Sequence, residues 1–386
     1  MPKTAKKKLI LIVLVMDLLL ISGCIQQKNL EKLGLITAEG YDLDKGSNIK
    51  GTAVIQKFDP MMQNVTRVIT EVAKTSKGLR QQENLQTSHK LVSGQLRIVV
   101  YSKTLAKKGI IQLVDTLNRD PTIGNMVYLT ISDKDASDIL TKNNVEKSIN
   151  LGTYLYNLIK QNVEGEQLIS PTLQEFNHNF YDVGKDPILP ILKLSHGDIV
   201  ISGMGMFKND RLIDELETNK LFYLKILVDQ YKAGSQEMAF NLKKFSKFII
   251  KSAGHRQKEL HNKMYITIDN IRSKHKIKLV NKQNLRFNIE VKLQSRILEM
   301  TEPLDVGNPA AIKLIEKEMS KAIKKDIEHL LSRLQDKGVD PIGFGNEYKA
   351  HLRGKKLTKK MWREKFKDAT FNVQVKNEIV RTGVID

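Results

Sequence analysis

The sequence is short of cysteine, tryptophan and proline, with one, one and nine of them among 386 residues. A single thiol cannot close an intrachain disulfide, and it cannot supply the several cysteines of a zinc or iron–sulfur site. Acidic residues are also scarce: 43 Asp and Glu stand against 63 Lys and Arg, so the formal net charge is +20. This excess suggests an anionic partner, either nucleic acid or a membrane surface. A disordered chain is excluded, because 41% of the residues are hydrophobic.

The spacings that mark common catalytic and metal sites are absent as well. The eight histidines form neither an H-E-x-x-H nor an H-x-x-H pattern. No G-x-x-x-x-G-K-[ST] phosphate loop and no G-x-S-x-G nucleophile segment occurs. Gly203-Met204-Gly205 lacks the third glycine of a dinucleotide loop, and the carboxylates Asp42 and Asp44 lie at a predicted turn. We therefore predict no catalytic residue, no metal ligand and no enzymatic activity.

The N-terminus has the layout of a secretory signal. Four lysines precede a mostly apolar run over 9–21, and small residues follow it. The run of 13 residues is shorter than the ~20 apolar residues of a spanning helix, and it contains Asp17. An aspartate near the middle of such a helix costs roughly 2.5–3.5 kcal/mol on insertion scales. We therefore predict that 1–23 is a signal peptide and not a permanent transmembrane helix.

The single cysteine closes this segment, in the tetrad Ile21-Ser22-Gly23-Cys24. The tetrad resembles the bacterial lipobox, in which the cysteine thiol receives a diacylglycerol and the chain is cut before that cysteine. The resemblance implies cleavage between Gly23 and Cys24, a lipid on Cys24 and no other cofactor. Two acyl chains on one residue suffice for stable anchoring in a bilayer. An ordinary signal peptide with a coincidental cysteine is the alternative.

Most of the net positive charge belongs to the C-terminal half. Residues 24–199 hold 21 basic and 19 acidic groups, and residues 200–386 hold 38 and 23, so the halves carry +2 and +15. Two segments, 243–286 and 349–367, are especially basic. The first has few aromatic side chains on which bases could stack, so we predict no binding of nucleic acid. Contact with anionic lipid and a merely solvated surface are the two interpretations of these clusters.

A break in composition near residues 186–205, rich in turn formers, predicts two α+β domains. They are 24–198 and 199–386, and the second is divisible near residue 250. In the first, periodicity predicts strands over 33–43, 51–58, 96–100 and 126–131. It also predicts helices over 103–118 and 151–161, and a short helix ending at Leu140 that Asp133 can cap.

The C-terminal half has the clearest patterns. Apolar and polar residues alternate over 285–297, which predicts a long strand with one wet face. Shorter strands are predicted over 264–268, 277–279 and 371–379, and these runs of strands suggest an antiparallel sheet. Apolar residues at spacings of three and four predict a helix over 310–337. Pro309 suits its first turn, and Gly338 its C-terminal cap.

Short motifs follow one another in order along the whole chain. The first half contains Leu33–Asp42, Gly94–Val100, the A-x-x-G helix of Leu105–Ile110, Arg119-Asp120-Pro121 and Asp138-Ile139-Leu140. The second half contains Gly205-Met206-Phe207-Lys208, the segment Asp340–Gly345, Trp362 and Arg381-Thr382-Gly383. In this order, and with the lipobox, they resemble the Ger(x)C lipoproteins, the C-subunit family of spore germinant receptors. Met206 is a departure, since the family has a small or β-branched residue there.

The resemblance implies a non-enzymatic lipoprotein on the outer face of the spore inner membrane. It would assemble with integral A and B subunits into a nutrient receptor, as a coupling or scaffolding subunit. The expected fold class is multidomain α+β, with mixed or antiparallel sheets flanked by helices. Two alternatives come from other classes of protein. One is a lipid-anchored solute-binding protein that captures the germinant itself, and the other is an envelope hydrolase.

Overall fold

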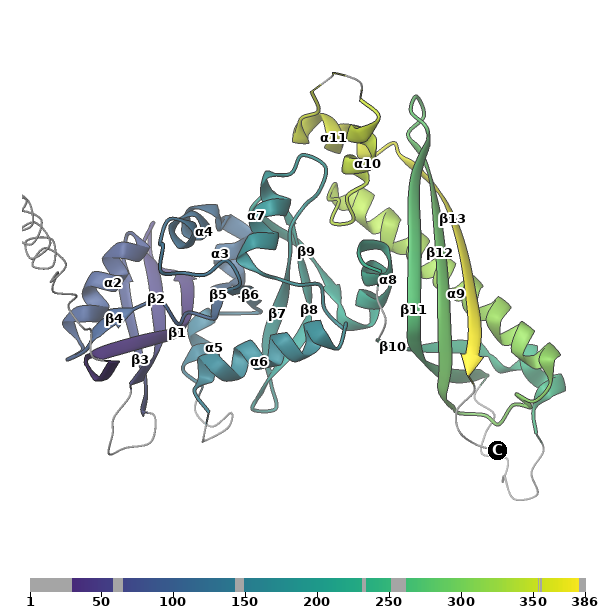
Figure 1. The fold of residues 1–386 in the computed structure, drawn as a ribbon, viewed down its shortest axis with the longest axis horizontal. Coiled ribbons are helices and arrows are strands. Elements are labelled where there is room, and N and C mark those ends of the chain that lie inside the picture. The colour runs from purple at the N-terminus through teal and green to yellow at the C-terminus, as the bar shows by residue number, and fades with distance from the viewer. Residues whose placement is uncertain are drawn as a thin grey trace, which may run out of the picture.

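Two β-sheets succeed one another along the long axis of the molecule, each with helices packed against it (Figure 1). The computed structural model describes residues 30–57, 65–142, 149–230, 234–250, 262–352, 354 and 356–381. The first sheet has the strand order β3 (Val65–Ala73), β2 (Ile49–Lys57), β1 (Leu33–Leu43), β5 (Ile98–Ser102), β6 (Tyr128–Ser132), β7 (Ile188–Ser195), β8 (Asp198–Lys208) and β9 (Arg211–Glu217), with β4 (Lys90–Val92) beside β1. The second has the order β10 (Ser235–Asn241), β11 (Lys263–Asn281), β12 (Arg286–Met300) and β13 (Thr370–Arg381). The predicted α+β class with mixed sheets is confirmed.

Helices cover both faces of the first sheet, which explains why its central strands are apolar throughout. All five residues of β5 are buried. Ile98 and Val100 pack in a core with α5 (Ala136–Leu140) and α6 (Leu151–Glu164). Val99 and Tyr101 pack on the other face, in a core with α2 (Ser76–Leu85), α3 (Lys103–Lys108), α4 (Ile111–Asn118) and α7 (Leu173–Tyr181). A short 3-10 helix, η1 (Leu30–Lys32), precedes β1.

The predicted helix over 103–118 is in fact two helices, because Gly109 interrupts it. Gly109 has a φ of 125°, a conformation that side chains disfavour, and a Cβ there would lie 2.6 Å from the carboxylate of Asp210. The Ile111 N–H donates to Asp210 Oδ2 at 3.2 Å. The turn between β8 and β9 therefore holds the break between α3 and α4 in place.

The prediction that Asp133 caps α5 is wrong. The free N–H groups at the start of this helix, those of Ala136 and Ser137, donate to the two carboxylate oxygens of Asp42 at 2.5 and 3.1 Å. Asp42 is buried at the end of β1, with Lys50 Nζ 3.4 Å away. A carboxylate from another strand thus satisfies the helix terminus, and the sequence motif near the helix did not reveal it.

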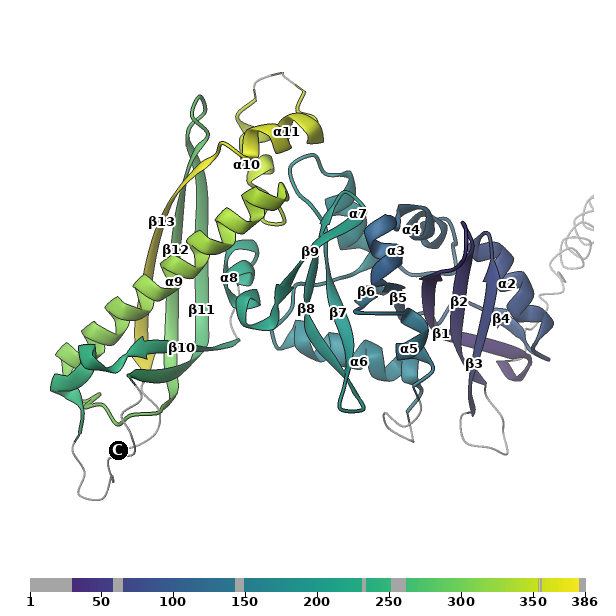
Figure 2. The ribbon, with the colours of Figure 1, turned by 180° about the vertical axis from the view of Figure 1, so that it is seen from behind.

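The second sheet is a long, twisted ribbon with helix α9 (Pro309–Lys337) across one face (Figure 2). The two strands predicted over 264–268 and 277–279 are one strand, β11. The sheet is not wholly antiparallel, since β13 runs parallel to β12. A parallel neighbour needs a long crossover, and α9 with α10 (Phe344–Ala350) and α11 (Lys359–Phe366) forms it. Gly338 ends α9 in the left-handed conformation at φ 64°, as predicted.

The predicted domain boundary at 198/199 does not coincide with a boundary between sheets. It falls at the turn between β7 and β8, which pair with each other inside the first sheet. The first sheet then continues to Glu217 at the end of β9. The predicted division near residue 250 does not separate two sheets either. Strand β10 lies before that point and β11 after it, and the two strands pair with each other. The 3-10 helix η2 (Leu242–Phe248) follows β10.

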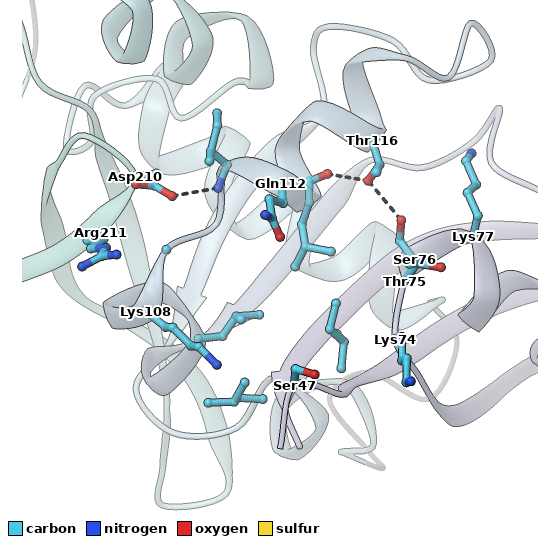
Figure 3. A pocket seen from close by; sticks show the side chains of 16 residues that line it. Ser47, Lys74, Thr75, Ser76, Lys77, Lys108, Gln112, Thr116, Asp210 and Arg211 are labelled. Carbon is cyan, nitrogen blue, oxygen red and sulfur yellow. Dashed lines mark hydrogen bonds between the residues drawn. The ribbon is translucent and has the colours of Figure 1, made fainter. Parts of the chain in front are cut away.

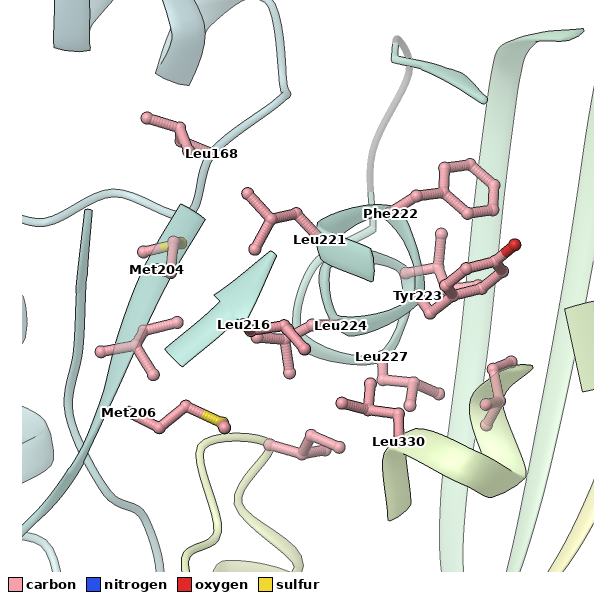
Figure 4. Packing of buried hydrophobic residues seen from close by; sticks show 14 of the residues in the cluster. Leu168, Met204, Met206, Leu216, Leu221, Phe222, Tyr223, Leu224, Leu227 and Leu330 are labelled. Atoms are coloured by element: carbon pink, nitrogen blue, oxygen red, sulfur yellow. The ribbon is translucent and has the colours of Figure 1, made fainter. Parts of the chain in front are cut away.

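Helix α8 (Thr218–Val228) fills the space between the two sheets (Figure 4). Every residue from Leu221 to Leu227 is buried, so this helix is enclosed on all sides. Leu221 lies toward Met204 of the first sheet, while Leu227 lies beside Leu330 of α9. One continuous apolar core therefore runs from the first sheet into the second.

Candidate functional site

The predicted processing residues Gly23 and Cys24 lie outside the described residues, so the lipid anchor stays a prediction. The described chain begins at the end of the molecule far from the second sheet (Figure 1). Among the described helices, none is both long and apolar enough to cross a bilayer. Within the same part of the chain, no three His, Cys, Asp or Glu side chains cluster in a way that could hold a metal ion.

A groove of about 570 Å³ opens on the α2–α4 side of the first sheet (Figure 3). Its walls come from four places in the chain: the β1–β2 turn, the start of α2, the α3–α4 break and the β8–β9 turn. Apolar side chains form part of its lining, namely Leu43, Ile49, Leu105, Ile111 and Leu113. The structure brings together segments that lie as far apart in the sequence as Leu43 and Arg211, which explains why local patterns did not reveal the groove.

Cations outnumber carboxylates at the rim of the groove, where Asp210 is the acidic residue of the lining. Lys74, Lys108 and Arg211 line it, and none of them has a carboxylate within 4.0 Å among the described residues. Lys77 is already paired with Asp120 at 2.7 Å. A positive rim around an apolar lining suits a small organic molecule with a carboxylate or phosphate and an apolar part.

A second arrangement joins the two sheets. The loop between α7 and β7 meets the turn after α9, and we call the residues Gly184, Asp186, Asp340, Gly345 and Arg363 the inter-sheet joint. The Asp186 N–H donates to the Asp340 carbonyl at 2.8 Å, and the Asp340 N–H donates back to the Asp186 carboxylate at 3.0 Å. Arg363 donates to the other Asp186 oxygen at 2.8 Å. The paired carboxylate and guanidinium are both largely buried.

The carboxylate of Asp340 is the centre of the joint and is fully buried. It accepts hydrogen bonds from the N–H groups of Gly343 at 2.7 Å and Gly345 at 2.9 Å, and from Trp362 Nε1 at 3.1 Å. Burial raises the pKa of Asp340 to about 7, although the backbone N–H donors oppose this by favouring the ionised form. The Gly-rich segment Asp340–Gly345 is thus organised around one buried acid.

Two glycines allow the backbones of the joint to touch. A Cβ on Gly345 would lie 2.4 Å from the Gly184 Cα and 2.7 Å from Trp362 Nε1. A Cβ on Gly184 would lie 2.3 Å from the Asn346 nitrogen. Such contacts with backbone atoms cannot be relieved by side-chain rotation, so only glycine fits at both positions.

Two residues of the basic segment 349–367 do not lie free on the surface. They bond to the part of the chain that carries the first sheet. Arg363 pairs with Asp186, and Lys359 Nζ donates to the Phe180 carbonyl. Arg353 and Lys355 lie outside the described residues. Charge alone did not distinguish the structural cations from the exposed ones, because the distinction depends on loop 182–187, far away in the sequence.

A group of buried polar side chains lies between α2 and the first sheet. Glu39 and Glu83 are both inaccessible to solvent, and Arg80 is the cation between them. Arg80 Nη2 donates to Glu39 at 3.2 Å, while Arg80 Nε lies 3.2 Å from Glu83 without the alignment of a hydrogen bond. Burial first, and then the nearby Glu39, raise the pKa of Glu83 to about 7. Periodicity identified none of these residues.

Known proteins resemble the chain over nearly its whole length. A model of the spore germination protein N-terminal domain matches residues 26–194, and a model described as spore germination B3/GerAC like, C-terminal, matches residues 202–383. Spore germination protein GerQC of Bacillus cereus is 27% identical over 365 residues, which cover 94% of this chain and 96% of that protein. Spore germination protein KC of Bacillus subtilis is 21% identical, with 98% and 97% covered.

One solved structure shares the fold. The crystal structure of the GerBC protein aligns with a TM-score of 0.51 and 16% sequence identity, over 89% of this chain and 97% of that one. The two family models meet between residues 194 and 202, close to the predicted domain boundary. The first sheet nevertheless contains strands from both matched regions, since β8 and β9 pair with β7.

Proposed function

The chain belongs to the GerAC family of spore germination proteins, and from this premise we propose that it is a lipid-anchored, non-catalytic C-type subunit of a spore germinant receptor. It couples or scaffolds integral-membrane A and B subunits during germination. The lipid on Cys24 holds it at the extracytoplasmic face of the spore inner membrane. The resemblance of the motifs to the Ger(x)C lipoproteins supports both the partners and the location.

The observation that carries the proposal is that the two matched family regions share one β-sheet and pack together as a single folded unit. Strands β8 and β9 of the C-terminal region complete the sheet of the N-terminal region. Helix α8 and the inter-sheet joint then fix the second sheet to the first. A rigid, elongated body can contact two partners at separated places and hold them at a fixed distance, which is what a scaffolding subunit requires.

Co-purification from spore membranes tests this proposal. The tagged chain, solubilised in mild detergent, should bring down one A-type and one B-type integral membrane subunit. A tagged, unrelated spore lipoprotein serves as the control. If the chain is recovered alone from membranes that contain both subunits, the receptor assignment is wrong.

Replacing Cys24 by alanine should release the chain from the membrane fraction. Without the thiol no diacylglycerol can be attached, and the two-chain anchor is lost. Gln27→Ala, three residues further along, is the matched control and should fractionate as the wild type does. Membrane and soluble fractions of spores are compared by immunoblot. A Cys24→Ala chain that stays with the membrane as fully as wild type would show that the thioether is not the anchor.

The groove on the first sheet favours a second candidate function, direct capture of the germinant. Its volume of about 570 Å³ suits a molecule the size of an amino acid, and three cations that have no carboxylate partner among the described residues could bind the carboxylate of such a molecule. In this case the subunit would sense the nutrient and not only hold the membrane subunits. Both functions can belong to one protein, and binding experiments distinguish them.

Calorimetry with amino acids and sugars tests this second candidate. If one of them binds, Lys108→Gln combined with Arg211→Gln should weaken it about tenfold or more, since a hydrogen bond to a charged group contributes about 1.5–3 kcal/mol. Lys317→Gln with Lys325→Gln, on the exposed side of α9, is the matched control. No heat from any of these ligands, with the chain folded, would leave the scaffolding function alone.

A further inference from the structure

Three lysines form a row across the open face of the second sheet. The register of β11 and β12 places Lys274 opposite Lys292, and the register of β12 and β13 places Lys292 opposite Lys376. Neighbouring strands lie about 4.8 Å apart, so the row spans only about 10 Å at the backbone. All three side chains are exposed.

Without a bound partner, the repulsion among these lysines destabilises the folded chain. Like charges directly opposite each other on adjacent strands are destabilising. Lys376 is paired with Glu378 at 2.5 Å. Lys274 and Lys292 have no carboxylate within 4.0 Å among the described residues. Among the described residues, Glu378 is the one carboxylate that lines the recess over the row, and it interacts with Lys292 as well as with Lys376. One carboxylate does not balance three lysines, so an anion bound between Lys274 and Lys292 would reduce the remaining repulsion.

The charge around the row has the same sign. Four further cations on the same strands are exposed, namely Arg272, Lys276, Lys278 and Arg286. A shallow recess of about 230 Å³ lies over the row, and Arg272 lines it together with the three lysines. Glu290 and Glu378 are the carboxylates on this part of the face. The face is therefore strongly positive and not a balanced mixture of charges.

The opposite face of the same strands is buried in the hydrophobic core. Phe287, Ile289, Val291 and Leu293 alternate with the exposed residues of β12 and are buried in the core that α9, α10 and α11 share with this sheet. Figure 1 looks onto the open face, and Figure 2 shows α9 on the other side. The described chain places no helix over the lysine row, so this face is available to a partner.

We propose that the lysine row and the cations around it dock on anionic phospholipid headgroups. The recess is shallow and its cations are exposed Lys and Arg side chains, unlike the backbone N–H cradles that enclose a single free phosphate. Cations spread over several rows suit a surface that presents many phosphates at once, and each Lys near such a surface contributes about 1 kcal/mol. The inference rests on the membrane location in the proposed function. It implies that the molecule lies along the bilayer, held by Cys24 at one end and by the second sheet at the other.

Amine footprinting on vesicles tests the docking. The full chain with its lipid anchor is reconstituted into vesicles of phosphatidylcholine alone, or with about one third phosphatidylglycerol, and labelled with an acylating reagent. If the row docks, three lysines contribute about 3 kcal/mol, so acylation of Lys274, Lys292 and Lys376 should fall at least severalfold on the anionic vesicles. Reactivity should return in 1 M salt, where screening is strong.

Internal controls decide between the outcomes. Lys317 and Lys325 are exposed on α9, on the other side of the sheet, and should react equally on both kinds of vesicle. In the Lys274→Gln/Lys292→Gln variant, Lys276 and Lys278 should lose their protection, whereas Lys313→Gln/Lys317→Gln should leave it intact. Equal reactivity of the row on both vesicles overturns the proposal. Protection of the row by soluble inorganic phosphate, or by a co-purified acidic subunit on neutral vesicles, would also overturn it. Either result leaves the receptor assignment to be judged by co-purification.

Discussion

Replacing Asp340 by alanine is expected to lower the free energy of unfolding by about 3–5 kcal/mol, because several buried N–H donors lose their acceptor at once. The variant loses the acceptor for three N–H groups, those of Gly343, Gly345 and Trp362. Each buried donor left without a partner costs about 1–3 kcal/mol. The loss falls on the inter-sheet joint, so the second sheet should separate from the first at lower denaturant concentration.

The chain contains its own probe for this measurement. Trp362 is the single tryptophan, it is 2% exposed, and its indole N–H bonds to Asp340. Urea unfolding followed by tryptophan fluorescence therefore reports on the joint directly. Asp336→Ala, on the exposed side of α9, is the matched control and should change the free energy by less than about 0.5 kcal/mol. An effect of Asp340→Ala no larger than this control would contradict the role assigned to the buried acid.

Stability should depend on pH through Glu83. Its pKa is raised from 4.5 to about 7 in the folded chain. The folded state therefore holds the proton more tightly than the unfolded state does. The stabilisation is fully present below pH 4.5 and is lost as the pH rises through about 7. At 1.36 kcal/mol per pKa unit, the loss amounts to about 3 kcal/mol.

The Glu83→Gln variant isolates this contribution. Glutamine is neutral at every pH, so wild type should lose about 3 kcal/mol more than the variant between pH 4.5 and 8. Asp340, whose pKa is also raised to about 7, contributes equally to both proteins and cancels in the difference. Glu299→Gln, at an exposed position, is the control and should follow the wild type. Parallel stability curves for wild type and Glu83→Gln would show that Glu83 is ionised when buried.

Residues with strong local patterns were predicted well. The strand over 33–43 has the predicted bounds, and the long helix begins at Pro309 and ends before Gly338. In both cases the pattern repeats along one continuous segment, so periodicity and end residues suffice. The helix over 103–118 was predicted as one element because hydrophobic spacing does not show a positive φ at Gly109.

The candidate sites also differ in whether local sequence is enough to identify them. Cys24 is specified by four consecutive residues and needs no fold to be identified. The groove and the joint could not be predicted, because each depends on side chains from distant segments. Asp186 and Asp340, which bond to each other, lie 154 residues apart. In the sequence both look like ordinary turn residues, and nothing local indicates that they are buried together.

The sequence by itself determined the composition class, the periodic strands and helices, the predicted lipid-anchor motif and the resemblance to the germination family. Each of these depends on neighbouring residues or on motifs in linear order. The tertiary structure alone decided that the first sheet crosses the predicted domain boundary, that Asp42 caps α5, and that Lys274, Lys292 and Lys376 lie in one row. The reason is physical. Strand register and the contacts of buried polar groups arise from hydrogen bonds between remote segments, and the periodicity within one segment does not predict them.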